Sequence, residues 1–129
     1  MAKELNKKVL FKGYVDNVSK YIASASCFAM TSDFEGMPNA LIEAMCIGVP
    51  CIATDCDGGG IRELINSKNG ILIKRNDIPS LVDSLIKVVS DKKLAEEIGK
   101  NATLIKEHLS YDNIYGKWEQ YIDSIGGKK

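Results

Sequence analysis

Short apolar runs alternate with helical patterns through the first part of the chain. Continuous apolar runs are typical of strands that are buried on both faces of a parallel sheet, and such runs occur at 9–13, 27–30, 49–54 and 70–73. Between them, apolar residues recur at helical spacing, which predicts helices at 18–25, 37–47 and 61–65. Asp16 is the expected cap of the first of these helices.

Three more helices are predicted after the last strand. Pro79 suits a first helical turn, and a wide apolar stripe accompanies it at Ile78, Leu81, Val82, Leu85, Ile86 and Val89. A second stripe consists of Leu94, Ile98, Ala102 and Ile105. A third helix, capped by Ser110, carries its stripe at Ile114, Trp118, Tyr121, Ile122 and Ile125. We expect the Trp118 and Tyr121 side chains to pack in the core.

Strand and helix alternate four times, which predicts an α/β fold with a Rossmann-like parallel sheet of about four strands and flanking helices. No repeat or linker divides the sequence, so residues 1–129 are expected to form a single domain. Ligands of such sheets bind beyond the carboxyl ends of the strands. The segments 14–16, 31–39 and 55–60 follow predicted strands and are therefore the expected ligand-binding loops.

Composition narrows the classes of function. The 129 residues are 45% hydrophobic and 26% charged, with 17 basic and 17 acidic residues. This balance gives no reason to expect nucleic acid or an acidic membrane as a partner. No apolar run reaches the ~20 residues of a membrane span, and the amino terminus lacks the apolar core of a signal peptide. We therefore expect a cytoplasmic protein.

The cysteines do not suggest a metal site. Cys27, Cys46, Cys51 and Cys56 form no C-x-x-C pair, and the only histidine, His108, lies far from them in the sequence. This spacing suits neither a zinc site nor a disulfide framework. We expect small buried thiols in a reducing compartment.

Glu43 is unusual in its predicted helix. Between Met37 and Val49 the only polar side chains are Asn39 and Glu43. A helix that is apolar on every face is normally buried, and a buried carboxylate without a partner is costly. Glu43 is therefore expected to be neutralised by a neighbour or to face a cavity that receives a polar ligand. A vicinal diol such as a ribose would suit it; a structural hydrogen bond to backbone groups is the alternative.

The loop "TSDFEGMPNA" (31–40) turns at Gly36 and enters the helix near Pro38. Free N–H groups at a helix start, together with the helix dipole, form an anion site. The alternative is an ordinary strand-to-helix turn. Glu35 and Glu43 also form a carboxylate pair of the kind used in acid/base chemistry.

The segment "DGGGIRE" (57–63) places three glycines just after a predicted strand. Glycine lets the backbone approach a phosphate or a sugar closely. The same segment could equally be a tight connection, with Arg62 and Glu63 capping or pairing locally.

Together these stretches resemble the carboxyl-terminal half of a glycosyltransferase family 4 enzyme, a retaining, nucleotide-sugar-dependent transferase with two Rossmann-like domains (the GT-B fold). The matching segments are "FKGYV" (11–15), "SDFEGMPNALIEAMCIGVPCIATD" (32–55), "GGIREL" (59–64) and "NGILI" (69–73). In combination they are a highly specific signature that spans most of the chain from Val9 onward. The C-terminal helices match only in general pattern.

The resemblance implies a role for each matched residue. Glu43 would bind the ribose hydroxyls, and Glu35 would be the catalytic-site carboxylate that contacts the donor sugar. The helix start would receive the diphosphate and sugar, through Gly36, Met37, Pro38, Asn39, Ala40 and Leu41. Tyr14 and Val15 would lie against the base, with Gly59 and Gly60 close to the donor. The donor would be a UDP-, GDP- or ADP-sugar, held without a metal or another cofactor.

The resemblance also implies what this chain lacks. Family members carry two more strand–helix units before the "FKGYV" strand, including a basic pair that clamps the diphosphate, and an N-terminal domain that binds the acceptor. This chain starts after both and resembles a truncated donor-binding domain that is inactive alone. The N-terminal domain would be its partner and the only route to peripheral membrane contact. The expected process is the synthesis of cell-surface polysaccharide or glycoconjugate.

Two other functions stay open at this point. One is a nucleotide-sugar epimerase-like enzyme on the same architecture. The other is a non-catalytic module that binds a nucleotide sugar or a protein partner.

In the family's sheet, two strands that this chain lacks would separate 9–13 from 27–30. We predict that the chain closes this gap, giving a sheet ordered 9–13, 27–30, 49–54, 70–73. The helices from Ile78 to Ile125 would then cover one face. We also predict a homo-oligomer that forms through the exposed sheet edge or face.

Overall fold

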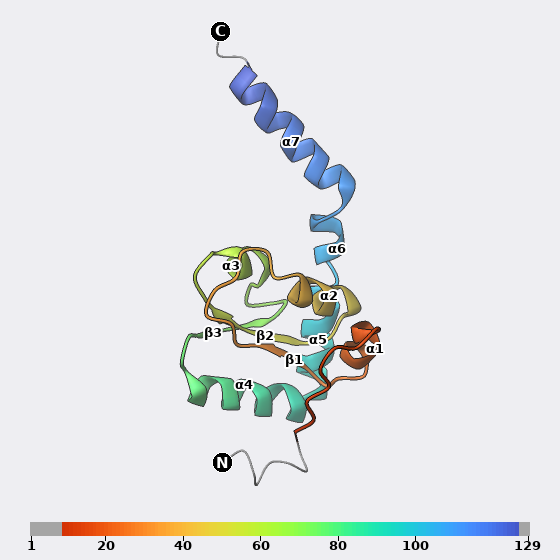
Figure 1. Cartoon of the computed structure of the whole chain (residues 1–129), viewed down its shortest axis with the longest axis vertical. Coiled ribbons are helices and arrows are strands. Elements are labelled where there is room, and N and C mark those ends of the chain that lie inside the picture. The colour runs from red at the N-terminus through yellow and green to blue at the C-terminus, as the bar shows by residue number, and fades with distance from the viewer. Residues whose placement is uncertain (1–8, 127–129) are drawn as a thin grey trace.

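A computed structural model describes residues 9–126 of the chain and shows a three-stranded parallel sheet with helices on both faces (Figure 1). The strands are β1 (Phe28–Met30), β2 (Cys51–Asp55) and β3 (Ile71–Lys74), in the order β1-β2-β3. Phe28 is paired with Cys51, and Ile52 with Ile71. The predicted parallel α/β fold is therefore confirmed, with three strands instead of four. The outer limits of the predicted single domain lie outside the described residues.

Residues 9–126 contain seven helices, one more than predicted: α1 (Val18–Ala23), α2 (Asn39–Ile47), α3 (Gly60–Leu64), α4 (Ile78–Ser90), α5 (Lys92–Ala102), α6 (Ile105–His108) and α7 (Tyr111–Gly126). The predicted helix that carries Ala102 and Ile105 is divided into α5 and α6. Asn17, and not the expected Asp16, caps α1, because its side chain accepts a hydrogen bond from the Lys20 N–H. Asp77 caps α4 in the same way. Pro79 lies in the first turn of α4, as predicted.

Two apolar clusters lie on opposite faces of the sheet. The larger one joins α1, α2, α3, α5 and α6 to the sheet, with Leu41, Met45 and Ile61 almost fully buried. The smaller one packs α4 on the other face, where Val88 meets Ile52 and Ile73. Helix α5 contributes Ala102 to the first cluster and Ala95 to the second. Because β2 is covered on both faces, it is buried along nearly its whole length, and its first three residues are apolar.

The predicted strand at 9–13 does not form. These residues have no strand pairing, and the Phe11 side chain is 95% exposed. A strand needs a neighbour that accepts its backbone hydrogen bonds, and the sheet order β1-β2-β3 includes no pairing of 9–13 with β1. The predicted four-strand order is therefore wrong. Self-association stays a prediction, and light scattering tests it.

The C-terminal helix also differs from expectation. Helix α7 extends away from the body of the molecule, contacts α6 and has no buried residue (Figure 1). Trp118 and Tyr121 contact each other edge to face, and Trp118 is 60% exposed. The expectation that both pack in the core is wrong, because the apolar stripe of α7 has no facing element in the described structure. Of the helices after Ile78, α4 and the start of α5 cover the expected face.

Candidate functional site

The loops after β1 and β2 are joined by their backbones at the carboxyl edge of the sheet. The Glu35 N–H donates a 3.0 Å hydrogen bond to the Asp57 carbonyl, next to a parallel bridge between Phe34 and Asp57. Below them, the buried Thr54 hydroxyl donates to the Ser32 carbonyl at 2.6 Å. Two of the three predicted ligand-binding loops, 31–39 and 55–60, therefore form one continuous surface.

Glycines make this contact possible. A Cβ atom on Gly60 would lie 1.5 Å from the Gly36 carbonyl oxygen, and one on Gly58 would lie 2.1 Å from that of Glu35. Gly58 also has a φ of +100°, in the left-handed region. The tight connection that the sequence left as an alternative is thus present. Gly59 also has positive φ, at +79°, and faces open space.

Both arginines near this edge are paired with carboxylates. Arg75 donates to Asp57 at 2.9 Å and to the Asp33 carbonyl at 3.2 Å, which ties the loop after β3 to the other two. Arg62 pairs with Asp55. The hydrogen bond from Arg62 lowers the pKa of the Asp55 carboxyl below its usual range. Local pairing of Arg62, one of the sequence alternatives, is confirmed.

Glu35 is half-buried and has a defined orientation. Its Oε1 atom accepts a 2.7 Å hydrogen bond from the Ser32 hydroxyl. This single contact leaves most of the hydrogen-bonding capacity of the carboxylate free for a ligand. Glu35 is held in place by its backbone and its side chain together.

The start of α2 presents N–H groups that have no acceptor. The first bonded amide is that of Ile42, which donates to the Pro38 carbonyl at 3.1 Å. Pro38 occupies the cap position, and no side chain caps the helix. Within residues 9–126, the amides of Asn39, Ala40 and Leu41 therefore have no partner. The geometry is that of an anion-binding helix terminus.

Glu43 is exposed, which corrects the expectation of a buried carboxylate. Helix α2 buries Leu41, Ala44 and Met45 but leaves Asn39, Ala40, Glu43 and Ile47 exposed. The sequence misled because small and apolar residues also occupy the outer face. Glu43 lies one turn beyond Asn39 and Ala40 on the same side of the helix. No side-chain hydrogen bond to Glu43 is present among residues 9–126, so the structural alternative has no support there.

Tyr14 and Val15 lie apart from this arrangement, in the segment before α1. They line a shallow pocket together with residues of α1, among them Lys20 and Tyr21. Tyr14 is almost fully exposed, whereas Val15 is half-buried. Their predicted contact with a base stays a prediction.

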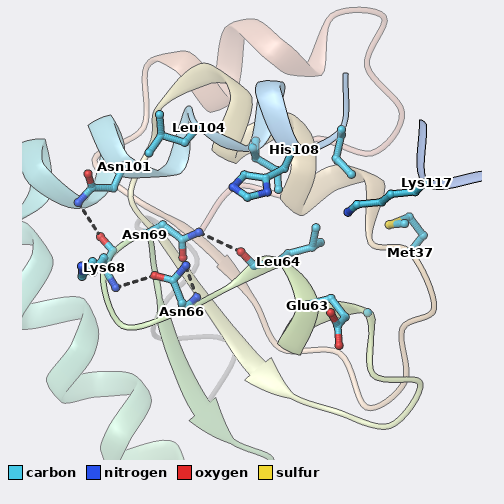
Figure 2. Close-up of a pocket in the computed structure, with 13 residues that line it drawn as sticks. Met37, Glu63, Leu64, Asn66, Lys68, Asn69, Asn101, Leu104, His108 and Lys117 are labelled. Carbon is cyan, nitrogen blue, oxygen red and sulfur yellow. Dashed lines mark hydrogen bonds between the residues drawn. The ribbon is translucent and has the colours of Figure 1, made fainter. Parts of the chain in front are cut away.

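A cavity of about 370 Å³ borders the loop surface and was not anticipated from the sequence (Figure 2). Met37 and Gly60 line one end of it, and α3, the 66–69 turn, α6 and α7 supply the rest. Neither Glu35 nor Glu43 belongs to its lining. His108 and Lys117 do, and no sequence signal marked them because they come from helices outside the recognised motifs.

The thiols behave largely as expected. Cys51 and Cys56 are buried, Cys27 and Cys46 are half-buried, and all four are free. Burial, with a smaller contribution from Cys27, raises the pKa of the Cys51 thiol to about 12. Among residues 9–126 no cluster of three or more His, Cys, Asp or Glu side chains has the geometry to hold a metal ion.

Comparison with known proteins decides the family. The model of the family "Glycosyl transferases group 1" matches residues 1–104. The chain belongs to this family. Its fold, a parallel sheet with flanking helices, matches that of GT-B glycosyltransferase structures in the group.

Two relatives of the chain carry a similar stretch inside longer chains. The chain is 32% identical over 123 residues to poly(ribitol-phosphate) alpha-N-acetylglucosaminyltransferase of Staphylococcus aureus, covering 95% of this chain and 25% of that protein. It is 32% identical over 128 residues to N-acetyl-alpha-D-glucosaminyl L-malate synthase of Bacillus anthracis, covering 97% and 33%. The chain thus spans a quarter to a third of the length of these relatives.

A solved structure also resembles the chain over a part of its own length. A mutant of S. aureus TarM, crystallised with fondaparinux, alpha-GlcNAc-glycerol and UDP, superposes with a TM-score of 0.82 at 32% identity. The match covers 92% of this chain and 24% of TarM.

Within residues 9–126, no helix combines the length and the apolar character that crossing a membrane requires.

Proposed function

We propose that this chain is the donor-binding part of a retaining family 4 glycosyltransferase. The full enzyme would transfer a sugar from a nucleotide diphosphate sugar to a glycan, lipid or other acceptor, in the cytoplasmic synthesis of a cell-surface polysaccharide or glycoconjugate. The observation that carries the proposal is the family match over residues 1–104, combined with the unpartnered amides at the start of α2.

We place the diphosphate of the donor at the start of α2. The amides of Asn39, Ala40 and Leu41 point along the helix axis, and the helix dipole adds a partial positive charge there. Gly36 leaves open space beside this terminus, since a Cβ on it would meet no atom within 4 Å. Backbone groups can therefore neutralise part of the leaving group without a metal.

The two carboxylates of the motif take hydroxyl groups. Glu43 projects from the same side of α2 as Asn39 and Ala40, one turn further along. A ribose attached to a diphosphate at the helix start lies within reach of such a carboxylate, which can accept both hydroxyls. Glu35, held by Ser32 and by Asp57, contacts the donor sugar on the other side of the diphosphate. Tyr14 and Val15 cover the base, and Gly59 and Gly60 border the donor.

Leaving-group departure needs more positive charge than this surface offers. Arg62 and Arg75 are each engaged with a carboxylate already. A cation clamp and an acceptor pocket would come from a partner domain of the full enzyme. We expect the 129-residue chain alone to show no transfer in a radiolabelled assay. Measurable turnover by the purified chain would contradict this part of the proposal.

Glycosyl transfer is favoured over epimerisation of a nucleotide sugar as the reaction of the full enzyme. The relatives named above are a transferase and a synthase, and neither is an epimerase. Product analysis of the full-length protein separates the two: a glycosylated acceptor supports transfer, and a free epimerised nucleotide sugar supports the alternative. A non-catalytic binding module would give neither product.

Ligand-observed NMR tests donor binding directly. Saturation-transfer difference spectra are recorded for UDP, GDP and ADP, each mixed with the chain. Saturation should pass from the protein to the ribose and base protons of one nucleotide more strongly than to those of the other two. TarM crystallised with UDP, so UDP is the first candidate. Absence of saturation transfer for all three nucleotides with a folded chain would refute the proposal.

A further inference from the structure

The cavity bordered by α3, the 66–69 turn, α6 and α7 shares Met37 and Gly60 with the donor site proposed above, whereas its other lining residues have no role in that site. It has an apolar floor, where Leu64 and Ile105 are buried, and a polar rim that includes Asn101, His108, Lys117 and Glu63 (Figure 2). An apolar floor with a few polar groups at the rim is typical of a small-molecule site.

The charges around this cavity favour an anion. Two lysines, Lys68 and Lys117, line it against a single carboxylate, Glu63, and His108 adds a ring N–H that can donate to an anion. Figure 2 shows the Lys117 ammonium group and the His108 ring directed into the same space. Within residues 9–126, none of these four side chains forms an ion pair or a side-chain hydrogen bond. The two lysine ammonium groups and the ring nitrogens of His108 are therefore available to a ligand.

The walls are held by hydrogen bonds that do not use these charges. The Asn69 side chain donates to the Leu64 carbonyl at 3.0 Å, and the Asn101 side chain donates to the Lys68 carbonyl at 3.1 Å. At the joint between α6 and α7, the Asn113 side chain donates to the Glu107 carbonyl. Lys117 follows one turn after Asn113, so its approach to the cavity is set by this joint.

We propose that this cavity binds a phosphorylated polyol or sugar. Lys117 and His108 contact the phosphate, because charge-assisted hydrogen bonds to a phosphate are the strong ones. Glu63 accepts hydroxyl groups, and the carbon chain lies over Leu64 and Ile105. Met37 and Gly60 line the end nearest the donor loops, so the ligand lies beside the donor and not in its place.

The chain carries its own reporters for this site. It has one histidine and one tryptophan, His108 and Trp118, and Trp118 adjoins Lys117. Titration of the chain with sn-glycerol 3-phosphate at constant ionic strength should shift the Hε1 resonance of the only imidazole, that of His108, saturably. Inorganic phosphate should bind more weakly than glycerol 3-phosphate, because it makes no contact with Glu63 or the floor.

Two variants and a control locate the effect. Lys117→Gln should weaken glycerol 3-phosphate binding about tenfold, the effect of losing one charge-assisted contact. His108→Gln, followed by Trp118 fluorescence, should weaken it similarly. Lys87→Gln, which changes an exposed residue of α4 at the other face of the sheet, should leave binding unchanged.

Three results would overturn the proposal. One is no saturable shift in the folded chain. Another is equal weakening by Lys117→Gln and Lys87→Gln. The third is competition between UDP and glycerol 3-phosphate for the His108 signal, which would assign the phosphate site to the donor. Binding of UDP without such competition supports two separate sites. If glycerol 3-phosphate binds but UDP does not, the result contradicts only the donor proposal.

Discussion

The Glu35 backbone N–H lies 3.0 Å from the Asp57 carbonyl oxygen, and this hydrogen bond joins the loop after β1 to the loop after β2. The two segments are 22 residues apart in sequence, but they present a single surface at the carboxyl edge of the sheet. Gly36 and Gly60 stand in direct backbone contact beside this bond. The position of Glu35 and the start of α2 therefore depends on how closely the two loops pack.

Gly60→Ala tests this dependence. The added methyl would lie 1.5 Å from the Gly36 carbonyl oxygen, so the loops must separate. We expect the free energy of unfolding to fall by about 1–3 kcal/mol, as for other overpacked sites, in urea denaturation.

Gly116→Ala is the matched control. Gly116 lies within α7, and a methyl there would meet no atom within 4 Å. Alanine favours a helix over glycine by about 1 kcal/mol, so this variant should be no less stable than the parent. A Gly60→Ala chain as stable as Gly116→Ala would show that the loop contact is not tight.

The strands at 27–30, 49–54 and 70–73 were predictable from the sequence because a parallel sheet covered on both faces needs continuous apolar runs. The run at 9–13 has the same character but no partner, and pairing is a property of the neighbour as well as of the segment. The prediction that the apolar stripe of α7 packs in the core was wrong for the same reason, because helical periodicity does not say which element faces the stripe.

The site was predictable only in part. Motif spacing indicated the loops, which meet as expected through Glu35 and Asp57. The exposure of Glu43 was not predictable, because Ala40 and Ile47 make the outer face of α2 look like an inner one. The cavity with His108 and Lys117 depends on contacts between segments distant in sequence, and no local pattern indicates it.

Acid should weaken the ion pair between Asp55, at the end of β2, and Arg62 of α3. Arg62 lowers the pKa of Asp55 in the folded chain, so the ionised carboxylate favours folding. That stabilisation is complete above the unfolded pKa of about 3.9 and is lost as the pH falls through the lower folded value. The urea midpoint of the parent should exceed that of Asp55→Asn at neutral pH, and the difference between the two midpoints should shrink as the pH falls. Asp83→Asn, which changes an exposed residue of α4, should show no such convergence.

Cys51 should resist thiol reagents in the native chain. Its side chain is fully buried, and burial raises the pKa of its thiol to about 12. The reactive thiolate is therefore scarce at neutral pH. Labelling followed by peptide mass analysis should show Cys46, which is half-buried, modified before Cys51. Equal labelling of the two under native conditions would contradict the burial of β2.

Calorimetric titration of the chain with the nucleoside diphosphate that it prefers tests the central claim most directly. Glu43→Ala should weaken binding by about 1–3 kcal/mol, the usual cost of losing charged hydrogen bonds, because Glu43 grips the ribose beyond the α2 terminus. Glu97→Ala, which removes an exposed carboxylate from α5, should leave the dissociation constant unchanged. An unchanged dissociation constant in a folded Glu43→Ala chain would contradict the assignment of Glu43 to the ribose of the donor.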